Sequence, residues 1–146
     1  MQGLGDLNLS LILAAIGSGL GAGVAGLSAI GAWKKAYALN KAAPFILVAF
    51  VGAPLSQTIY GMILRNAIMG ANIVDPSGKA QMLLGAFSGF AMGLSAFMQG
   101  KASAKACDAL TETGKGFGNY IMVIGIIETV ALFIMVFCLT ALPKAV

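Results

Sequence analysis

The sequence contains no histidine, only two cysteines and few charged residues. Charged side chains make up 10% of its 146 residues and hydrophobic ones 59%, whereas an ordinary soluble domain has roughly 25% charged residues. Without histidine, a metal centre built on His and Cys ligands is not expected. A short chain this apolar cannot bury all of its apolar surface away from water, so the sequence predicts a membrane protein.

Other absences exclude further classes of function. The lysines stand at the ends of apolar runs and form no basic stripe with interleaved aromatics, so nucleic-acid binding is not expected. Cys107 should lie beyond the end of the third helix and Cys138 within the fourth, so we expect no disulfide and interpret both as small apolar packing residues. The bilayer segments offer no histidine and no second acid for general acid–base chemistry, so the chain is not expected to be an enzyme by itself.

What the sequence does contain is four long apolar runs: Leu7–Trp33, Ala42–Leu64, Ala80–Gly100 and Gly116–Pro143. Each can span a bilayer as a helix of about 20 residues, whereas open strands cannot be satisfied in lipid. The sequence therefore predicts an all-α membrane protein with four transmembrane helices. The loops between these helices are short, so neighbouring helices run antiparallel and form two hairpins. The first hairpin is residues 1–72, with helices at about 7–33 and 43–70, and the second is residues 73–146, with helices at about 79–106 and 116–143.

The loops differ in charge between the two sides of the predicted membrane. Loops 34–41 and 101–115 hold six lysines, whereas the other side has Arg65, Lys79 and Lys144. The positive-inside tendency makes the lysine-rich side cytoplasmic and places both termini outside. A prokaryotic cell membrane is the expected location.

The two hairpins share a short repeat and many small residues. GLSAIGAWK (26–34) aligns without a gap with GLSAFMQGK (93–101), and each segment ends an odd-numbered helix with a lysine at its cytoplasmic edge, which we interpret as a duplicated hairpin. Glycines four residues apart, such as Gly17 and Gly21 or Gly89 and Gly93, let backbones approach closely in lipid. Helix one has small residues on more than one face, which suggests the crowded inner wall of a ring; packing within one chain is the simpler alternative.

Glu128 is the only charged residue between Lys115 and Lys144. Its place in the run puts it near the middle of the membrane, beyond the reach of snorkelling. An ionised residue there costs roughly 2.5–3.5 kcal/mol on insertion scales. Glu128 must therefore be protonated, paired with a cation or turned to a polar cavity. An ion-carrying role is our interpretation, and a neutral Glu that links two helices is the structural alternative.

The second helix offers partners for this carboxylate. Ala53, Ser56, Gln57 and Tyr60 stand at i, i+3, i+4 and i+7, on one helical face. Pro54 beside them removes an N–H and so frees a backbone carbonyl one turn back.

The third helix adds Gln99 near its cytoplasmic end. The combined donors are one carboxylate, two amides, a hydroxyl and backbone carbonyls, which suit a hard cation. A single negative charge favours a monovalent ion, Na⁺ or Li⁺ before K⁺, over Ca²⁺. Tyr60 is expected to hydrogen-bond Glu128 and orient it. For each polar residue alone, ordinary helix–helix hydrogen bonding is the alternative.

Several segments carry a resemblance to a known family: the glycine-rich first helix, PLSQTIYG (54–61), FMQGKASA (97–104) and IIETVALF (126–133). Together they closely resemble the membrane rotor-ring proteolipid of V/A-type rotary ATPases. The resemblance implies a ring of identical subunits, with helices one and three as its inner wall. In the sodium-translocating branch it implies that Na⁺ is held by Glu128, Gln57, Gln99, Ser56 and the backbone carbonyl of Ala53, while Tyr60 hydrogen-bonds the carboxylate.

The resemblance also implies a mechanism and partners. Na⁺ binding at Glu128 would be coupled to ring rotation and to ATP hydrolysis or synthesis. The implied partners are a stator subunit that bears an Arg, central-stalk subunits that contact loops 34–41 and 101–115, and the surrounding lipid. Two positions depart from the family pattern, because Ser56 replaces the commoner Thr and Ala53 a larger apolar residue. The same ring carrying H⁺ and a static four-helix pore or scaffold remain as alternatives.

Overall fold

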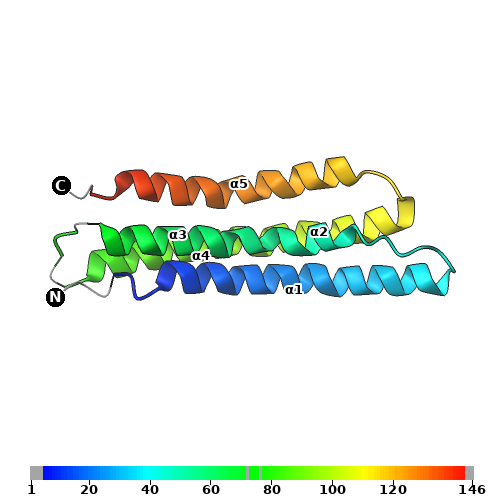
Figure 1. Ribbon diagram of the computed structural model, residues 1–146, viewed down its shortest axis with the longest axis horizontal. Coiled ribbons are helices and arrows are strands. Elements are labelled where there is room, and N and C mark those ends of the chain that lie inside the picture. Colours follow the sequence, from blue (N-terminus) through cyan, green and yellow to red (C-terminus); the bar gives the residue numbers. More distant parts are fainter. Residues whose placement is uncertain (1–4, 72, 76, 144–146) are drawn as a thin grey trace.

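The computed structural model describes residues 5–71, 73–75 and 77–143, all of them in helices or short connections (Figure 1). The elements are α1 (Leu9–Ala38), α2 (Leu47–Gly52), the 3₁₀ turn η1 (Ala53–Leu55), α3 (Ser56–Gly70), α4 (Lys79–Thr113) and α5 (Phe117–Ala141). α2, η1 and α3 continue one another, so four helical columns are long and apolar enough to cross a membrane. The described residues contain no strand. The predicted all-α fold of two antiparallel hairpins is confirmed.

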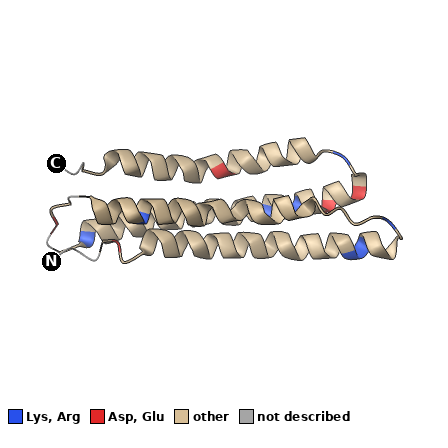
Figure 2. Ribbon diagram, viewed as in Figure 1, with Lys and Arg blue, Asp and Glu red and all other residues tan. Residues whose placement is uncertain are grey.

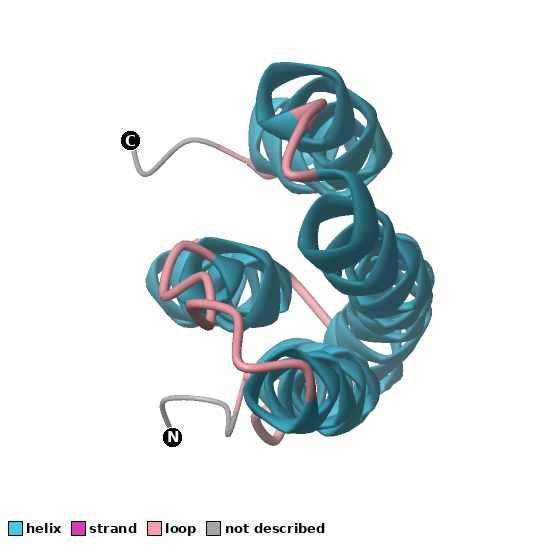
Figure 3. Cartoon of the chain, turned by 90° about the vertical axis from the view of Figure 1, so that its right-hand side faces the viewer, coloured by secondary structure: helices cyan, strands magenta, loops and turns pink. Residues whose placement is uncertain are grey.

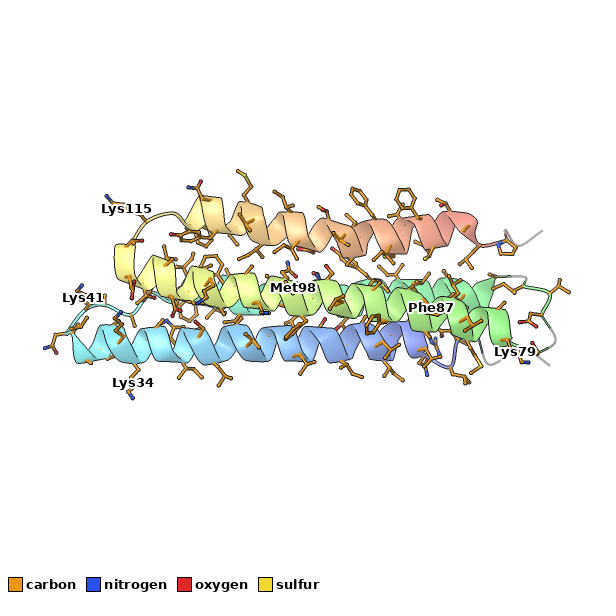
Figure 4. All side chains as sticks on the ribbon, turned by 180° about the vertical axis from the view of Figure 1, so that it is seen from behind. Lys34, Lys41, Lys79, Phe87, Met98 and Lys115 are labelled. Atoms are coloured by element: carbon orange, nitrogen blue, oxygen red, sulfur yellow. The ribbon has the colours of Figure 1, made fainter. Side chains whose placement is uncertain are left out.

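Most charged residues lie toward the two ends of the columns, and one acidic position lies near the middle of α5 (Figure 2). Lys34, Lys41 and Lys115 lie at one end and Lys79 at the other (Figure 4). The lysine-rich loops therefore share one side, as the hairpin topology requires, while Lys144 lies outside the described residues.

Two helices run further than the sequence predicted. α1 continues to Ala38 and α4 to Thr113, so most of the segments 34–41 and 101–115, which we expected to be loops, is helical. The prediction ended the first helix before Lys34 and the third at about residue 106, but lysine, glutamate and alanine favour helix in water. α4 ends instead at Gly114, whose left-handed φ of 66° suits glycine and whose N–H bonds to Leu110 O.

α1 and α4 pack with their backbones in close contact, and glycines make this possible. A Cβ atom at Gly17 would lie 2.0 Å from the carbonyl oxygen of Gly93, and one at Gly100 would lie 2.2 Å from that of Gly21. No side chain fits such a gap, so these positions require glycine. Viewed along the helices, the columns stand side by side, with α5 at the top and α1 at the bottom (Figure 3).

The contact also shows that the two segments of the repeat lie at different depths. Gly17 lies against Gly93 and Gly21 against Gly100, so the two parallel helices are level there. Gly26, which the gap-free alignment paired with Gly93, therefore lies more than two turns further along. The alignment followed a local likeness of small residues, whereas the packing is set by which glycines meet backbone.

Two apolar clusters fill the interior between the columns. One lies toward the lysine-rich end and includes Phe50, Cys107 and Ile124. The other lies toward the opposite end and includes Leu64, Met92 and Ala131. Along three of the columns, the polar residues of the predicted site lie between these two clusters. Both cysteines are free thiols, Cys107 buried and Cys138 half-buried. Cys107 lies within α4 and not beyond its end as the sequence predicted, because α4 continues to Thr113.

Aspartates hold the starts of α1 and α4. Asp6 is fully buried and accepts hydrogen bonds from the backbone N–H groups of Asn8 (3.0 Å) and Ser10 (2.9 Å). Asp75 accepts one from the N–H of Ala80 (2.7 Å), which is the main reason that the pKa of its carboxyl is lowered. Both carboxylates satisfy N–H groups that the first turn of a helix leaves without partners.

Candidate ion-binding site

The second column breaks its α-helical pattern at the predicted site. Ala53–Leu55 form one 3₁₀ turn around Pro54, between α2 and α3. The Ser56 hydroxyl bonds to the Ala53 carbonyl oxygen (3.2 Å) and lies at the same distance from Gln57 Oε1. Proline lacks the N–H that a regular helix needs, so the sequence itself sets this local break. It brings a backbone carbonyl, a hydroxyl and an amide together.

Gln57, Gln99 and Glu128 form a hydrogen-bonded chain across three columns. Gln57 Nε2 on α3 donates to Gln99 Oε1 on α4 at 2.8 Å. Gln99 Nε2 in turn donates to Glu128 Oε2 on α5 and to the backbone oxygen of Ile124, both at 3.2 Å. The chain therefore directs its donors toward the one carboxylate in the middle of the bundle.

Tyr60 completes the contacts of the carboxylate. Its hydroxyl donates to Glu128 Oε1 at 2.7 Å. Each oxygen of Glu128 thus accepts one side-chain hydrogen bond, from a different helix. Hydrogen bonds to a charged acceptor are stronger than neutral ones and fix its geometry. This is the orienting contact that the sequence predicted for Tyr60.

The site is shielded on its inner side and open on its outer side. Gln57 and Gln99 are fully buried, whereas Glu128, Tyr60 and Ser56 are half-buried. Figure 2 shows a single acidic position near the middle of α5. α5 is the least enclosed of the four membrane-length helices, with 17% of its most apolar window buried inside the chain. The carboxylate therefore lies at the edge of the bundle, level with hydrocarbon.

All six residues that the sequence singled out meet in this layer: Ala53, Ser56, Gln57, Tyr60, Gln99 and Glu128. Chemically the layer offers one negative charge and neutral oxygen atoms. Within the described residues, no three His, Cys, Asp or Glu side chains gather as a metal centre. Carboxylate, amide, hydroxyl and carbonyl oxygens are the ligands that hard cations prefer.

Sequence reasoning missed one contributor on α4. Ser95 stands four residues before Gln99, on the same helical face, and its hydroxyl donates to the backbone oxygen of Ile127 (2.9 Å). This bond fixes α5 next to Glu128. The spacing of four residues was the available signal, but a serine among glycines and alanines reads equally well as a packing residue.

Residues 82–141 match the family model of the ATP synthase C subunit. The matched segment covers most of α4 and all of α5, and with them Gln99 and Glu128. A search of the curated proteins and a search of the solved structures give no match. The match supports an ion-carrying subunit of a rotor ring in a rotary ATPase, a membrane subunit that is not itself catalytic.

Proposed function

We propose that this chain, whose second hairpin matches the family of the ATP synthase C subunit, carries Na⁺ in the rotor ring of a V/A-type rotary ATPase. One observation carries the proposal: the lone carboxylate is linked to two buried glutamines and a tyrosine from neighbouring helices. A proton carrier needs the carboxyl group alone. Two amides beside it add neutral oxygen ligands, which a proton does not use and Na⁺ does.

The proposed ligands are those oxygen atoms. Glu128 supplies the charge, and the side-chain oxygens of Gln57, Gln99 and Ser56 with the Ala53 carbonyl supply neutral ligands. Tyr60 holds the carboxylate in its orientation. The two amide oxygens accept hydrogen bonds in this structure, from Gln57 Nε2 and Ser56 Oγ. Cation binding therefore requires small side-chain rotations that release them.

Charge compensation gives the mechanism its direction. Glu128 lies at the outer edge of the bundle, where an ionised carboxylate facing hydrocarbon is costly. With Na⁺ bound the site is neutral and can rotate past lipid; without it, the carboxylate needs another cation. An Arg of a stator subunit would serve, and would displace Na⁺ into an exit path. The lysine-rich ends of α1 and α4 would face the central stalk, and identical copies would form the ring.

The direct test is labelling of Glu128 by a hydrophobic carbodiimide in intact membranes. We expect Na⁺ at constant pH to slow the labelling, because the bound ion occupies the carboxylate. Labelling that responds to pH but not to Na⁺ would show that the ring carries H⁺. No labelling under any condition would favour a static pore or scaffold.

A second test separates the two buried glutamines of α4. Gln99→Leu removes a proposed ligand and the donor to Glu128 Oε2, so the Na⁺ concentration that halves labelling should rise at least about tenfold, equivalent to about 1.4 kcal/mol. Gln81→Leu makes the same change at a buried position of the same helix outside the site, and should leave that concentration unchanged. Equal effects of both substitutions would contradict the assignment of Gln99.

A further inference from the structure

Ser18 on α1 is a buried serine whose hydroxyl has no hydrogen-bond partner. Its exposed fraction is 1%, and its Oγ atom is among the few buried side-chain atoms left unpaired within the described residues. The serines of the site layer are paired, Ser56 with Ala53 O and Ser95 with Ile127 O. A buried polar group without a partner is rare in native proteins and calls for a physical reason.

The packing of α1 on the second column places Ser18 at the level of Gln57. A Cβ atom at Gly61 would lie 2.9 Å from Cβ of Ala14, and one at Gly21 would lie 3.0 Å from Cβ of Pro54. Ser18 lies between Ala14 and Gly21 on α1, and Gln57 lies between Pro54 and Gly61 on the facing, antiparallel column. Residues four apart share a helical face. The two buried side chains therefore lie on facing sides at one depth.

The second hairpin shows what a serine at this level does. Ser18 follows Gly17, and Ser95 lies two residues after Gly93, the glycine that Gly17 contacts. The two serines are thus level on the parallel helices α1 and α4. Ser95 bonds the outer helix of its hairpin one residue before Glu128. Ser18 faces the outer column of the first hairpin at Gln57 but makes no such bond.

Cation binding creates a need that Ser18 can meet. Gln57 Nε2 now donates to Gln99 Oε1 at 2.8 Å. If Gln99 Oε1 is to bind Na⁺, it must release this donor, and a buried amide N–H then needs another acceptor. A serine hydroxyl has two acceptor lone pairs. The two residues that hydrogen-bond Gln57 in this structure, Ser56 and Gln99, are themselves proposed ligands.

We infer that Ser18 is a positioning residue for Gln57. Its hydroxyl accepts the Gln57 Nε2 hydrogen bond once Gln99 Oε1 turns to the cation, and so holds Gln57 with its oxygen toward the ion. The inference rests on the proposed function, because it requires a cation that both amide oxygens bind. It adds α1 to a site otherwise built from the other three columns.

The test is the Ser18→Ala substitution in the full chain, with Na⁺ protection of Glu128 against a hydrophobic carbodiimide measured on assembled protein in membranes. We expect the half-protecting Na⁺ concentration to rise about fivefold, as for the loss of one neutral hydrogen bond. The labelling rate without Na⁺ should stay that of the wild type, because Glu128 keeps its contacts. Ser103→Ala is the matched control, since Ser103 is also fully buried with an unpaired hydroxyl; it should behave as wild type.

The outcomes separate this inference from the function on which it rests. An unchanged half-protecting concentration in Ser18→Ala, with normal protection of the wild type, overturns the role of Ser18 alone. Equal shifts in Ser18→Ala and Ser103→Ala, or a changed labelling rate without Na⁺, also overturn it, because they indicate a general effect on packing. No Na⁺ protection of the wild type overturns the proposed function itself. If Ser18→Ala assembles poorly, Ser18→Cys, whose thiol is a weak acceptor, should give a shift in the same direction.

Discussion

The Glu128→Gln protein is expected to fold and assemble but to transport no Na⁺. Glutamine has nearly the shape of glutamate, and its amide oxygen can still accept a hydrogen bond from Tyr60 or Gln99, the two partners of the carboxylate. It has no charge to balance a cation, so Na⁺ in the site would face hydrocarbon uncompensated. ATP-driven ²²Na⁺ uptake into vesicles that contain the whole complex should fall to background.

The matched control is Glu112→Gln. Glu112 is an exposed carboxylate at the end of α4 and pairs with Lys35 of α1. An exposed ion pair contributes little stability, and Glu112 lies outside the polar layer, so uptake should remain close to that of the wild type. Substantial uptake by an assembled Glu128→Gln ring would show that another group carries the ion.

The second large effect is expected at Gly21. A single methyl group there would lie 2.3 Å from the backbone oxygen of Ala96 and 3.0 Å from both the Ala96 carbonyl carbon and Pro54 Cβ. Backbone atoms cannot move aside as a flexible side chain does, so Gly21→Ala must separate α1 from α4. We expect a loss of about 3 kcal/mol in the free energy of unfolding, the upper end of the usual cost of overpacking. Denaturation of the purified protein in detergent, followed by circular dichroism, measures it.

Gly19→Ala is the control on the same helix. A Cβ atom at Gly19 meets nothing within 4 Å, so the new methyl group is accommodated. Alanine favours helix over glycine, and the unfolding free energy should be equal to that of the wild type or slightly higher. A similar loss in both variants would mean that glycine flexibility, and not the α1–α4 contact, determines stability.

The site could be predicted from the sequence because its signals are local. The spacing of Ser56, Gln57 and Tyr60 puts them on one helical face, and a lone acid in an apolar run has few explanations. The structure brings Gln99 and Glu128 to the same layer. Their roles as ion ligands remain a prediction.

Other features could not be predicted because they depend on the packing of whole helices. That Gln57 donates to Gln99 and not directly to Glu128 depends on side-chain rotamers set by three columns at once. The depth of α1 relative to α4 depends on which glycines meet backbone, which a nine-residue alignment does not show. Charge marked the limits of the apolar runs but not the ends of α1 and α4, which continue beyond them.

Among the described residues, two apolar clusters enclose the polar layer, one around Phe50 and Cys107 and one around Leu64 and Met92. A hydrated ion would have to lose its water molecules to pass either cluster. In a close-packed apolar interior, the free-energy cost of this dehydration is prohibitive. An ion that binds at Glu128 is therefore expected to arrive laterally, from the half-buried side of this carboxylate. The chain is therefore expected to block the passage of ions along its axis, and an aqueous route to Glu128 would have to be formed with a neighbouring protein.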